Sequence, residues 1–376
     1  MTSLQQLISE RLPTHTLASY EARIQAAVRL LSRMCNVDPT REAKRLDLVR
    51  EHLGRRIGAA HPTQGQLANP VTAVQHQILS HMPTVIEMVL TLSRGEPRGF
   101  AYLTQGSAGA TLVESLTNLL RGVLELHLAS NGSAETATQI ADVFHAIFPT
   151  MSSLADFSAL AQALLVGVVP RDDTIEFKLY FNTRLDTSIP HRQKIMNVLT
   201  LCGISDIEGC GRMYDALYQS GGKSRFTGIG VDLADADGRV KMYVHAPRGD
   251  TVAFAEELIS KGYAHGPVVH AQRLIEATNG SASSRDCEVA FALRGSGPTT
   301  LKVTAFYDGK LVSAADGERL MALLHEWHYP TEPIRELLSA LSAPDAMIQK
   351  FPLHGIGVEL TDDAIPKVNV YVQACI

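Results

Sequence analysis

The stretch FTGIGVDLADADGRVKMYVHA, residues 226–246, is typical of two β-strands joined by a tight turn. The turn, ADADG, is rich in Asp and Gly, as hairpin turns require. In the second strand, polar and apolar residues alternate, so they lie on opposite faces. The apolar face holds Val240, Met242 and Val244, and the polar face holds Arg239, Lys241 and Tyr243. We therefore predict a β-hairpin with one buried face and one basic, aromatic face.

The same pattern occurs five times along the chain. The five predicted strand pairs are 84–105, 163–182, 226–246, 287–308 and 354–374, each with a turn rich in Gly, Pro, Asp or Ser. The second strands share a register. Equivalent positions carry Glu176, Arg239, Lys302 and Lys367, then Lys178, Lys241, Thr304 and Asn369, then Tyr180, Tyr243, Phe306 and Tyr371, with Arg98, Phe100 and Tyr102 in the first pair. Long periods of this kind indicate repeated supersecondary units that bury their apolar faces by associating.

Helical periodicity fills the segments between the strand pairs. The predicted helices are 17–35, 41–56, 107–127, 133–147, 189–202, 207–219, 251–262, 268–277, 314–327 and 332–342. On the second of these, Arg41, Lys44 and Arg45 are predicted to form an outward charged face. We expect residues 1–82 to form a helical segment packed on a single barrel domain of residues 83–376.

The repeated unit is helix, strand, strand, helix, and its fold class is α+β. Five units supply ten antiparallel strands, which can close into a barrel with no free edge. The apolar faces then lie under an outer ring of helices, so the basic and aromatic faces must line the inside of the barrel, the lumen. A barrel of this size is wide enough to hold a small ligand.

The predicted lumen is strongly basic and rich in tyrosine. Its members are Arg98, Lys178, Arg239, Lys241, Lys302 and Lys367, with Tyr102, Tyr180, Tyr243 and Tyr371. Cations gathered in a partly dry cavity repel one another unless an anion neutralises them, and a diphosphate does so with several charge-assisted hydrogen bonds. Aromatic faces stabilise an allyl cation and exclude water. The alternative is that these residues face solvent on an open sheet, which requires no such repetition.

Charge and composition argue against other partners. The net charge is −5 at pH 7 and there is no run of Lys and Arg, so neither nucleic acid nor an anionic membrane is an expected partner.

We find no secretion signal near the N-terminus and no apolar run of about 18 residues that would span a membrane. The five cysteines are scattered without metal spacing. We therefore expect reduced thiols in a cytoplasmic protein.

The sequence resembles the dimethylallyl-tryptophan synthase group of ABBA-barrel prenyltransferases over about residues 83–376. The resemblance rests on IEMVLTL followed by RGFAYL, on FKLYFN, on GIGVDLADADGRVKMYV and on VELTDDAIPKVNVYV. It implies one barrel of five αββα units that transfers an isoprenyl group from its diphosphate to an indole ring, with the prenyl diphosphate as co-substrate and no metal or other cofactor.

The resemblance also implies roles for individual residues. Glu87 accepts a hydrogen bond from the ring N–H of the acceptor, and Lys178 binds diphosphate and takes the ring proton as base. The other matching diphosphate ligands are Arg98, Arg239 and Lys241, and the matching shielding residues are Tyr180, Tyr243 and Tyr371. The shared register of the second strands adds Lys302 to the diphosphate ligands and Phe306 to the aromatic shield. The chain departs from the family pattern at Thr304, Phe306 and Asn369, which leaves the length of the prenyl chain open.

Other functions remain open at this stage. A phenol or naphthol could replace the indole, since a phenol also donates a hydrogen bond to Glu87. A non-catalytic carrier of hydrophobic ligands would gain nothing from buried cations. A magnesium site at Asp232, Asp235 and Asp237 is disfavoured, because these residues fall where a hairpin turn requires Asp anyway.

Overall fold

The computed structural model describes most of the chain. The described residues are 14–53, 86–105, 112–150, 164–170, 175–183, 188–219, 225–232, 239–279, 283–295, 297–307, 312–342, 350–351, 353–360 and 365–373.

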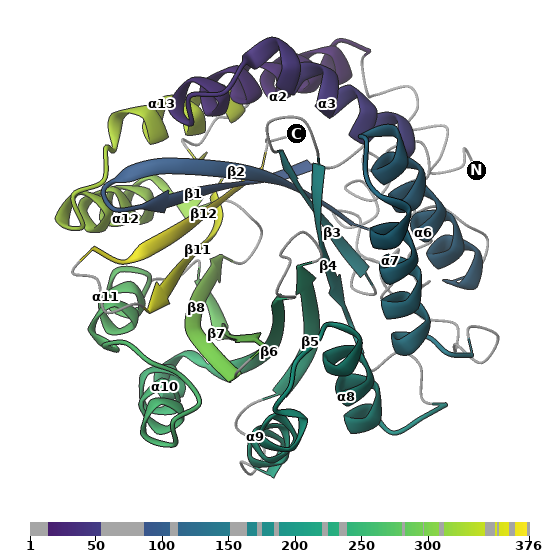
Figure 1. Cartoon of the computed structure of the whole chain (residues 1–376). Coiled ribbons are helices and arrows are strands. Elements are labelled where there is room, and N and C mark those ends of the chain that lie inside the picture. The colour runs from purple at the N-terminus through teal and green to yellow at the C-terminus, as the bar shows by residue number, and fades with distance from the viewer. Residues whose placement is uncertain are drawn as a thin grey trace, which may run out of the picture.

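A closed ten-stranded antiparallel barrel forms the centre of the molecule (Figure 1). Each strand pairs with its neighbours along the chain, and the first strand pairs with the last, with Val89 opposite Tyr371. This confirms the predicted α+β barrel, whose sheet has no free edge. Its strands are β1 (Ile86–Ser93), β2 (Glu96–Gln105), β3 (Leu164–Pro170), β4 (Ile175–Phe181), β5 (Arg225–Asp232), β6 (Arg239–Pro247), β7 (Ser283–Arg294), β8 (Gly297–Tyr307), β11 (Leu353–Leu360) and β12 (Lys367–Gln373).

Helices surround the barrel, two after each of the first four strand pairs (Figure 1). They are α6 (Leu112–Ala129), α7 (Ala134–Ile147), α8 (His191–Leu201), α9 (Ile207–Gln219), α10 (Thr251–Ser260), α11 (Val269–Ala277), α12 (Ala314–Glu326) and α13 (Glu332–Leu341). These bounds agree with the predicted helices to within a few residues at each described end. A short turn of 3₁₀ helix, η4 (Arg248–Asp250), precedes α10.

The N-terminal helices complete this ring. α2 (Thr14–Met34) packs against α13, and α3 (Pro39–His52) packs against α6, so they join the last helical pair to the first (Figure 1). Their apolar residues Ile24, Leu31 and Leu46 are fully buried in the same core as the barrel. The proposed division at residue 82 falls outside the described residues and stays a prediction.

The hydrophobic core lies between the sheet and the helices. Val240, Met242 and Val244 on β6 are fully buried there, as their alternation predicts. A feature that the sequence did not predict is a small two-stranded sheet of β9 (Val312–Ser313) and β10 (Lys350–Phe351). Among the helices that the structure describes, none combines the length and apolar character needed to cross a bilayer.

Candidate active site

The barrel encloses a cavity of about 1020 Å³, lined by side chains from all ten strands. This is at the upper end of the range for small-molecule sites, and it is large enough for two small ligands side by side. Ten of its lining residues were predicted as site residues. They are Glu87, Arg98, Lys178, Tyr180, Arg239, Lys241, Tyr243, Lys302, Phe306 and Tyr371.

Long side chains in the cavity lie against glycines of the neighbouring strand. A Cβ atom on Gly357 of β11 would lie 2.4 Å from Cε of Lys302 and 2.8 Å from Oγ1 of Thr304. On Gly230 of β5 it would lie 2.9 Å from the ring of Tyr243. These glycines belong to a GIGV segment that occurs twice, at residues 228–231 and 355–358, and they make room for the long lysine and tyrosine side chains of the neighbouring strands.

We predict that Gly357→Ala lowers kcat/KM for the prenyl diphosphate about tenfold, because the new methyl group displaces Lys302. Overpacking of this kind costs stability by about 1–3 kcal/mol, which urea unfolding would measure alongside steady-state kinetics. Gly249→Ala is the control, since nothing lies within 4 Å of a Cβ at that position. Equal kinetics for the two variants would contradict the packing argument.

The first strand pair departs from the predicted register. The ladder between β1 and β2 shifts after Thr91, which faces Gly99, whereas Leu92 faces Pro97, so Arg98 is the extra residue of a β-bulge. The predicted lumen position of Tyr102 is therefore wrong: its side chain is fully buried in the core under the helices, against Phe100.

Arg98 lies at the edge of the cavity. Its side chain is 52% exposed and forms an ion pair with Glu96 at 3.3 Å. The bulge itself explains why Arg98 lines the cavity although strict alternation from Gly99 would turn it away.

Five cations form a basic cluster, defined here as Lys178, Arg239, Lys241, Lys302 and Lys367. Two acidic side chains whose pairing with these cations is not predicted from the sequence balance part of this charge. Asp232 lies 3.6 Å from Lys178, and Glu359 lies 3.4 Å from Arg239 and 2.9 Å from Lys367. Asp232 faces Arg239 and Glu359 faces Lys367 next to the hairpin turns, so the cluster lies toward the turn end of the barrel.

Burial and mutual repulsion alter the protonation of the basic cluster. Burial lowers the pKa of Lys302 to about 8, and the charge of Arg239 acts in the same direction. Burial also lowers the pKa of Lys241 well below its usual value, assisted by Arg239 and Lys302. Burial alone would raise the pKa of Glu359, but the neighbouring cations, Lys367 first among them, hold it below its usual value. The charged forms of these two lysines are therefore disfavoured in the empty cavity, and an anion bound among them would stabilise those forms.

We predict that affinity for a diphosphate falls about tenfold between pH 7 and pH 9, since a hydrogen bond to a charged group is worth about 1.5–3 kcal/mol. Because the pKa of Lys302 is about 8, its ammonium is present below that pH and is lost as the pH rises through it. Calorimetric titration with inorganic diphosphate would measure the change. In Lys302→Arg the guanidinium stays charged, so its profile should be flatter than that of the wild type; parallel profiles would contradict the assignment.

Aromatic rings lie next to the basic cluster. The rings of Tyr180 and Tyr243 meet edge to face at 5.8 Å, and those of Phe306 and Tyr371 lie 5.7 Å apart. Lys302 donates a hydrogen bond to the Tyr371 hydroxyl and lies 4.9 Å from its ring centroid. Burial raises the pKa of the three tyrosines, so they stay neutral. Neutral aromatic faces beside an anion site can stabilise a cation formed there.

Two carboxylate–histidine pairs line another part of the same cavity. His354 Nδ1 donates to Glu87 Oε1 at 2.5 Å, and both side chains are largely buried. His245 Nε2 lies 3.9 Å from Glu288 Oε2. Burial raises the pKa of Glu288, against the effect of His245 and the nearby lysines. Of these four residues, only Glu87 is predicted as a site residue from the sequence.

Helix α3 also contributes charged residues to the cavity wall. Arg41, Glu42 and Arg45 line it, and Glu42 accepts a hydrogen bond from Arg45 at 2.7 Å while fully buried. The predicted outward charged face of this helix is therefore wrong for Arg45, which is 8% exposed. Burial raises the pKa of Glu42, although Arg45 and Arg41 oppose this.

The described residues contain no cluster of three or more His, Cys, Asp or Glu side chains suited to a metal ion. Of the three aspartates weighed as a metal site, Asp232 pairs with Lys178. Asp235 and Asp237 lie outside the described residues.

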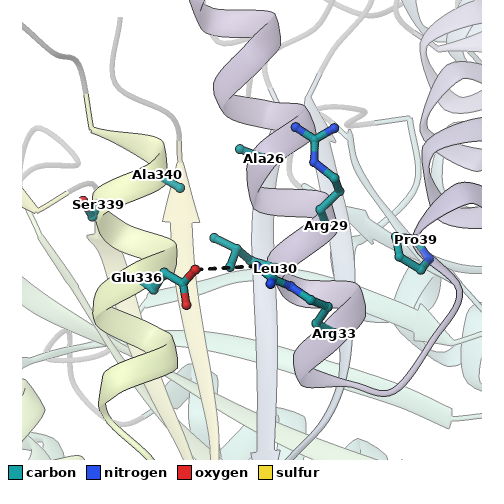
Figure 2. A pocket seen from close by; sticks show the side chains of 8 residues that line it. All are labelled: Ala26, Arg29, Leu30, Arg33, Pro39, Glu336, Ser339 and Ala340. Carbon is teal, nitrogen blue, oxygen red and sulfur yellow. Dashed lines mark ion pairs between the residues drawn. The ribbon is translucent and has the colours of Figure 1, made fainter.

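A second pocket lies on the outer surface, between α2 and α13 (Figure 2). The ion pair drawn across it joins Arg33 and Glu336 at 3.5 Å, and both side chains are more than 60% exposed. Exposed pairs of this kind contribute little to stability. The concentration of charged and aromatic groups in the barrel makes the lumen the candidate active site.

Several solved structures share this architecture. A 5-dimethylallyltryptophan synthase from Streptomyces coelicolor has a TM-score of 0.69 at 12% identity, over 94% of this chain and 97% of that one. A 6-dimethylallyltryptophan synthase from Micromonospora olivasterospora, in complex with DMASPP and Trp, has a TM-score of 0.66 at 18% identity, over 94% and 97%. The prenyltransferase PriB has a TM-score of 0.67 at 16% identity, over 94% and 96%. No protein-family model matches the chain, and no curated protein does either. The chain therefore has the fold of the ABBA-barrel prenyltransferases over nearly its whole length.

Proposed function

We propose that the chain is an aromatic prenyltransferase that moves an allyl group from its diphosphate to an indole ring. The observation that carries this proposal is the order of groups in one cavity: the basic cluster, then neutral tyrosines, then the Glu87–His354 pair. These three parts suit a diphosphate leaving group, an allyl cation and a ring that donates a hydrogen bond. The likeness of the fold to solved dimethylallyltryptophan synthases supports it.

In the proposed reaction, the C–O bond of the allyl diphosphate breaks and the diphosphate leaves with the electron pair. The basic cluster and Arg98 neutralise the growing negative charge, which is where preorganised cations contribute most. Tyr180, Tyr243, Tyr371 and Phe306 surround the allyl cation and exclude water that would capture it. A ring carbon of the acceptor then bonds to the allyl carbon, and a base takes the proton from that carbon.

Glu87 is proposed to orient the acceptor. One carboxylate oxygen is engaged by His354, and the second can accept the ring N–H. A negative charge opposite the ring nitrogen favours the positive charge that develops on the ring as the new bond forms. The proposed substrates are therefore a prenyl diphosphate and tryptophan or a tryptophan-derived metabolite.

The test is incubation of the protein with dimethylallyl diphosphate and L-tryptophan, with and without EDTA, followed by mass spectrometry. A product heavier by one isoprenyl unit in both samples would support the proposal, including its independence of metal. If tryptophan fails, geranyl diphosphate, other indoles, and phenols or naphthols are tried. If only a phenol were prenylated, the acceptor would be a phenol and not an indole. Binding without any turnover would favour a carrier of hydrophobic ligands.

A further inference from the structure

His354 reaches the cavity through an irregularity in its strand. On β11, Ile356, Val358 and Leu360 are buried under the helices, and simple alternation would place His354 with them. The ladder with β12 shifts between Leu353, which faces Val372, and Gly355, which faces Tyr371. His354 is thus the extra residue of a β-bulge, and it lines the cavity. Bulges of this kind re-aim side chains and are common beside active sites.

The contact with Glu87 determines which nitrogen of His354 carries a proton. An ionised carboxylate only accepts hydrogen bonds, so Nδ1, 2.5 Å from Oε1 of Glu87, must be the donor. In a neutral imidazole, Nε2 then keeps its lone pair. Among the described residues, the hydrogen bond to Glu87 is the only one recorded for His354, and its ring packs against Phe306 at 5.0 Å. The result is an oriented imidazole with an available acceptor nitrogen.

The alternative base, Lys178, is in a different electrostatic setting. Its Nζ lies 3.6 Å from Oδ2 of Asp232, within the basic cluster. A lysine in an ion pair is an ammonium, which has no lone pair to accept a proton. Its charge is also what a diphosphate requires. Lys178 therefore suits diphosphate binding better than proton removal.

We propose that His354 is the catalytic base of this active site, an inference that rests on the proposed function. After the ring carbon of the indole bonds to the allyl carbon, that carbon still carries its hydrogen and the ring is cationic. The C–H electron pair returns to the ring and the proton passes to Nε2 of His354. The imidazolium that forms is stabilised by the carboxylate of Glu87, through Nδ1–H. The diphosphate has already left with the electron pair of the broken C–O bond, so the step balances without an oxidant or a metal.

The test separates a base from a positioning residue with two variants. His354→Asn keeps a side-chain N–H that can donate to Glu87 but cannot take the proton, whereas His354→Ala removes both capacities. We expect His354→Asn to lower kcat about 10²-fold, the usual contribution of a general base, with KM for tryptophan little changed. With L-tryptophan deuterated on the indole ring, a primary isotope effect on kcat should appear in His354→Asn. Added imidazole should restore part of the activity of His354→Ala.

The outcomes are distinct. If His354→Asn stays within about threefold of the wild type, less than the contribution expected of a general base, and shows no isotope effect, His354 is not the base and the inference is overturned. The proposed function then still stands on the wild-type turnover. If the wild type prenylates no acceptor in the panel of indoles and phenols, the proposed function itself fails. Thermal unfolding of both variants checks that they are folded. Lys178→Met, assayed in parallel, should raise KM for the diphosphate without producing the isotope effect.

Discussion

Glu87→Gln is expected to lower kcat for L-tryptophan about 10²- to 10³-fold, the usual effect of removing one preorganised group that stabilises developing charge. Glutamine has nearly the same shape, so the acceptor still fits. The negative charge opposite the ring nitrogen is lost, and with it the carboxylate that fixes His354. Because a buried charge is costly to keep in a folded protein, its removal should leave the melting temperature unchanged or slightly raised.

A methylated acceptor tests whether this loss arises at the ring nitrogen. 1-Methyltryptophan has no ring N–H, so the wild type should turn it over slowly and Glu87→Gln should reduce that rate much less than it reduces the rate with tryptophan. Glu336→Gln is the matched control, because Glu336 lies in the second pocket, on the outer surface between α2 and α13 (Figure 2), and its side chain is 62% exposed. Equal losses on both acceptors would show that Glu87 acts otherwise than through the ring N–H.

The barrel and the basic and aromatic part of its cavity wall follow from a register that can be read in the sequence. Lys178 and Tyr180, and again Lys241 and Tyr243, repeat at a nearly constant spacing on strands with an apolar opposite face. Such a period is enforced by the packing of the helices on every unit, so alternation alone predicts which side chains enter the lumen. The structure places all four of these residues on the cavity wall.

Bulges limit that prediction, because one inserted residue reverses the alternation that follows it. Alternation therefore predicts the wrong face for Tyr102, and it gives no indication that His354 enters the cavity. No composition signal separates a bulged position from its neighbours here: Arg98 and His354 are followed by glycine, but so are regular strand residues of the GIGV repeats. The positions of these two side chains depend on how neighbouring strands align, which is a property of the closed sheet.

The acidic partners of the basic cluster could have been found. Asp232 and Glu359 occupy the same position in the repeats GIGVD and GIGVE, at the end of the first strand of a pair. Each lies next to a basic residue at the start of the second strand, Arg239 in one case and Lys367 in the other. Since buried cations require counter-charges, the repeated acid next to the repeated base predicts an ion pair between them. Glu288 has no such repeat, and alternation along β7 was its only signal.

Within the basic cluster, replacing Lys241 with methionine is expected to weaken diphosphate binding while stabilising the empty protein. Lys241 is partly buried, and both its desolvation and the charges of Arg239 and Lys302 oppose its protonation. Methionine fills a similar volume without charge, so both the desolvation and the repulsion disappear. Binding loses one charge-assisted hydrogen bond, worth about 1.5–3 kcal/mol, or roughly 10- to 100-fold in Kd. Calorimetry with inorganic diphosphate and thermal unfolding of the ligand-free protein measure the two effects.

The same substitution at Lys367 should have the opposite effect on stability. Lys367 lies 2.9 Å from Glu359, and without it Arg239, at 3.4 Å, would be the remaining ion-pair partner of Glu359 among the described residues. Removing one partner of a buried ion pair leaves an uncompensated charge and costs about 3–5 kcal/mol where burial is complete. Lys367→Met should therefore melt at a lower temperature than the wild type, and Lys241→Met at a higher one. If both variants were destabilised alike, repulsion would not be what distinguishes Lys241. Opposite shifts would show that the empty cavity holds Lys241 at a cost that bound diphosphate offsets.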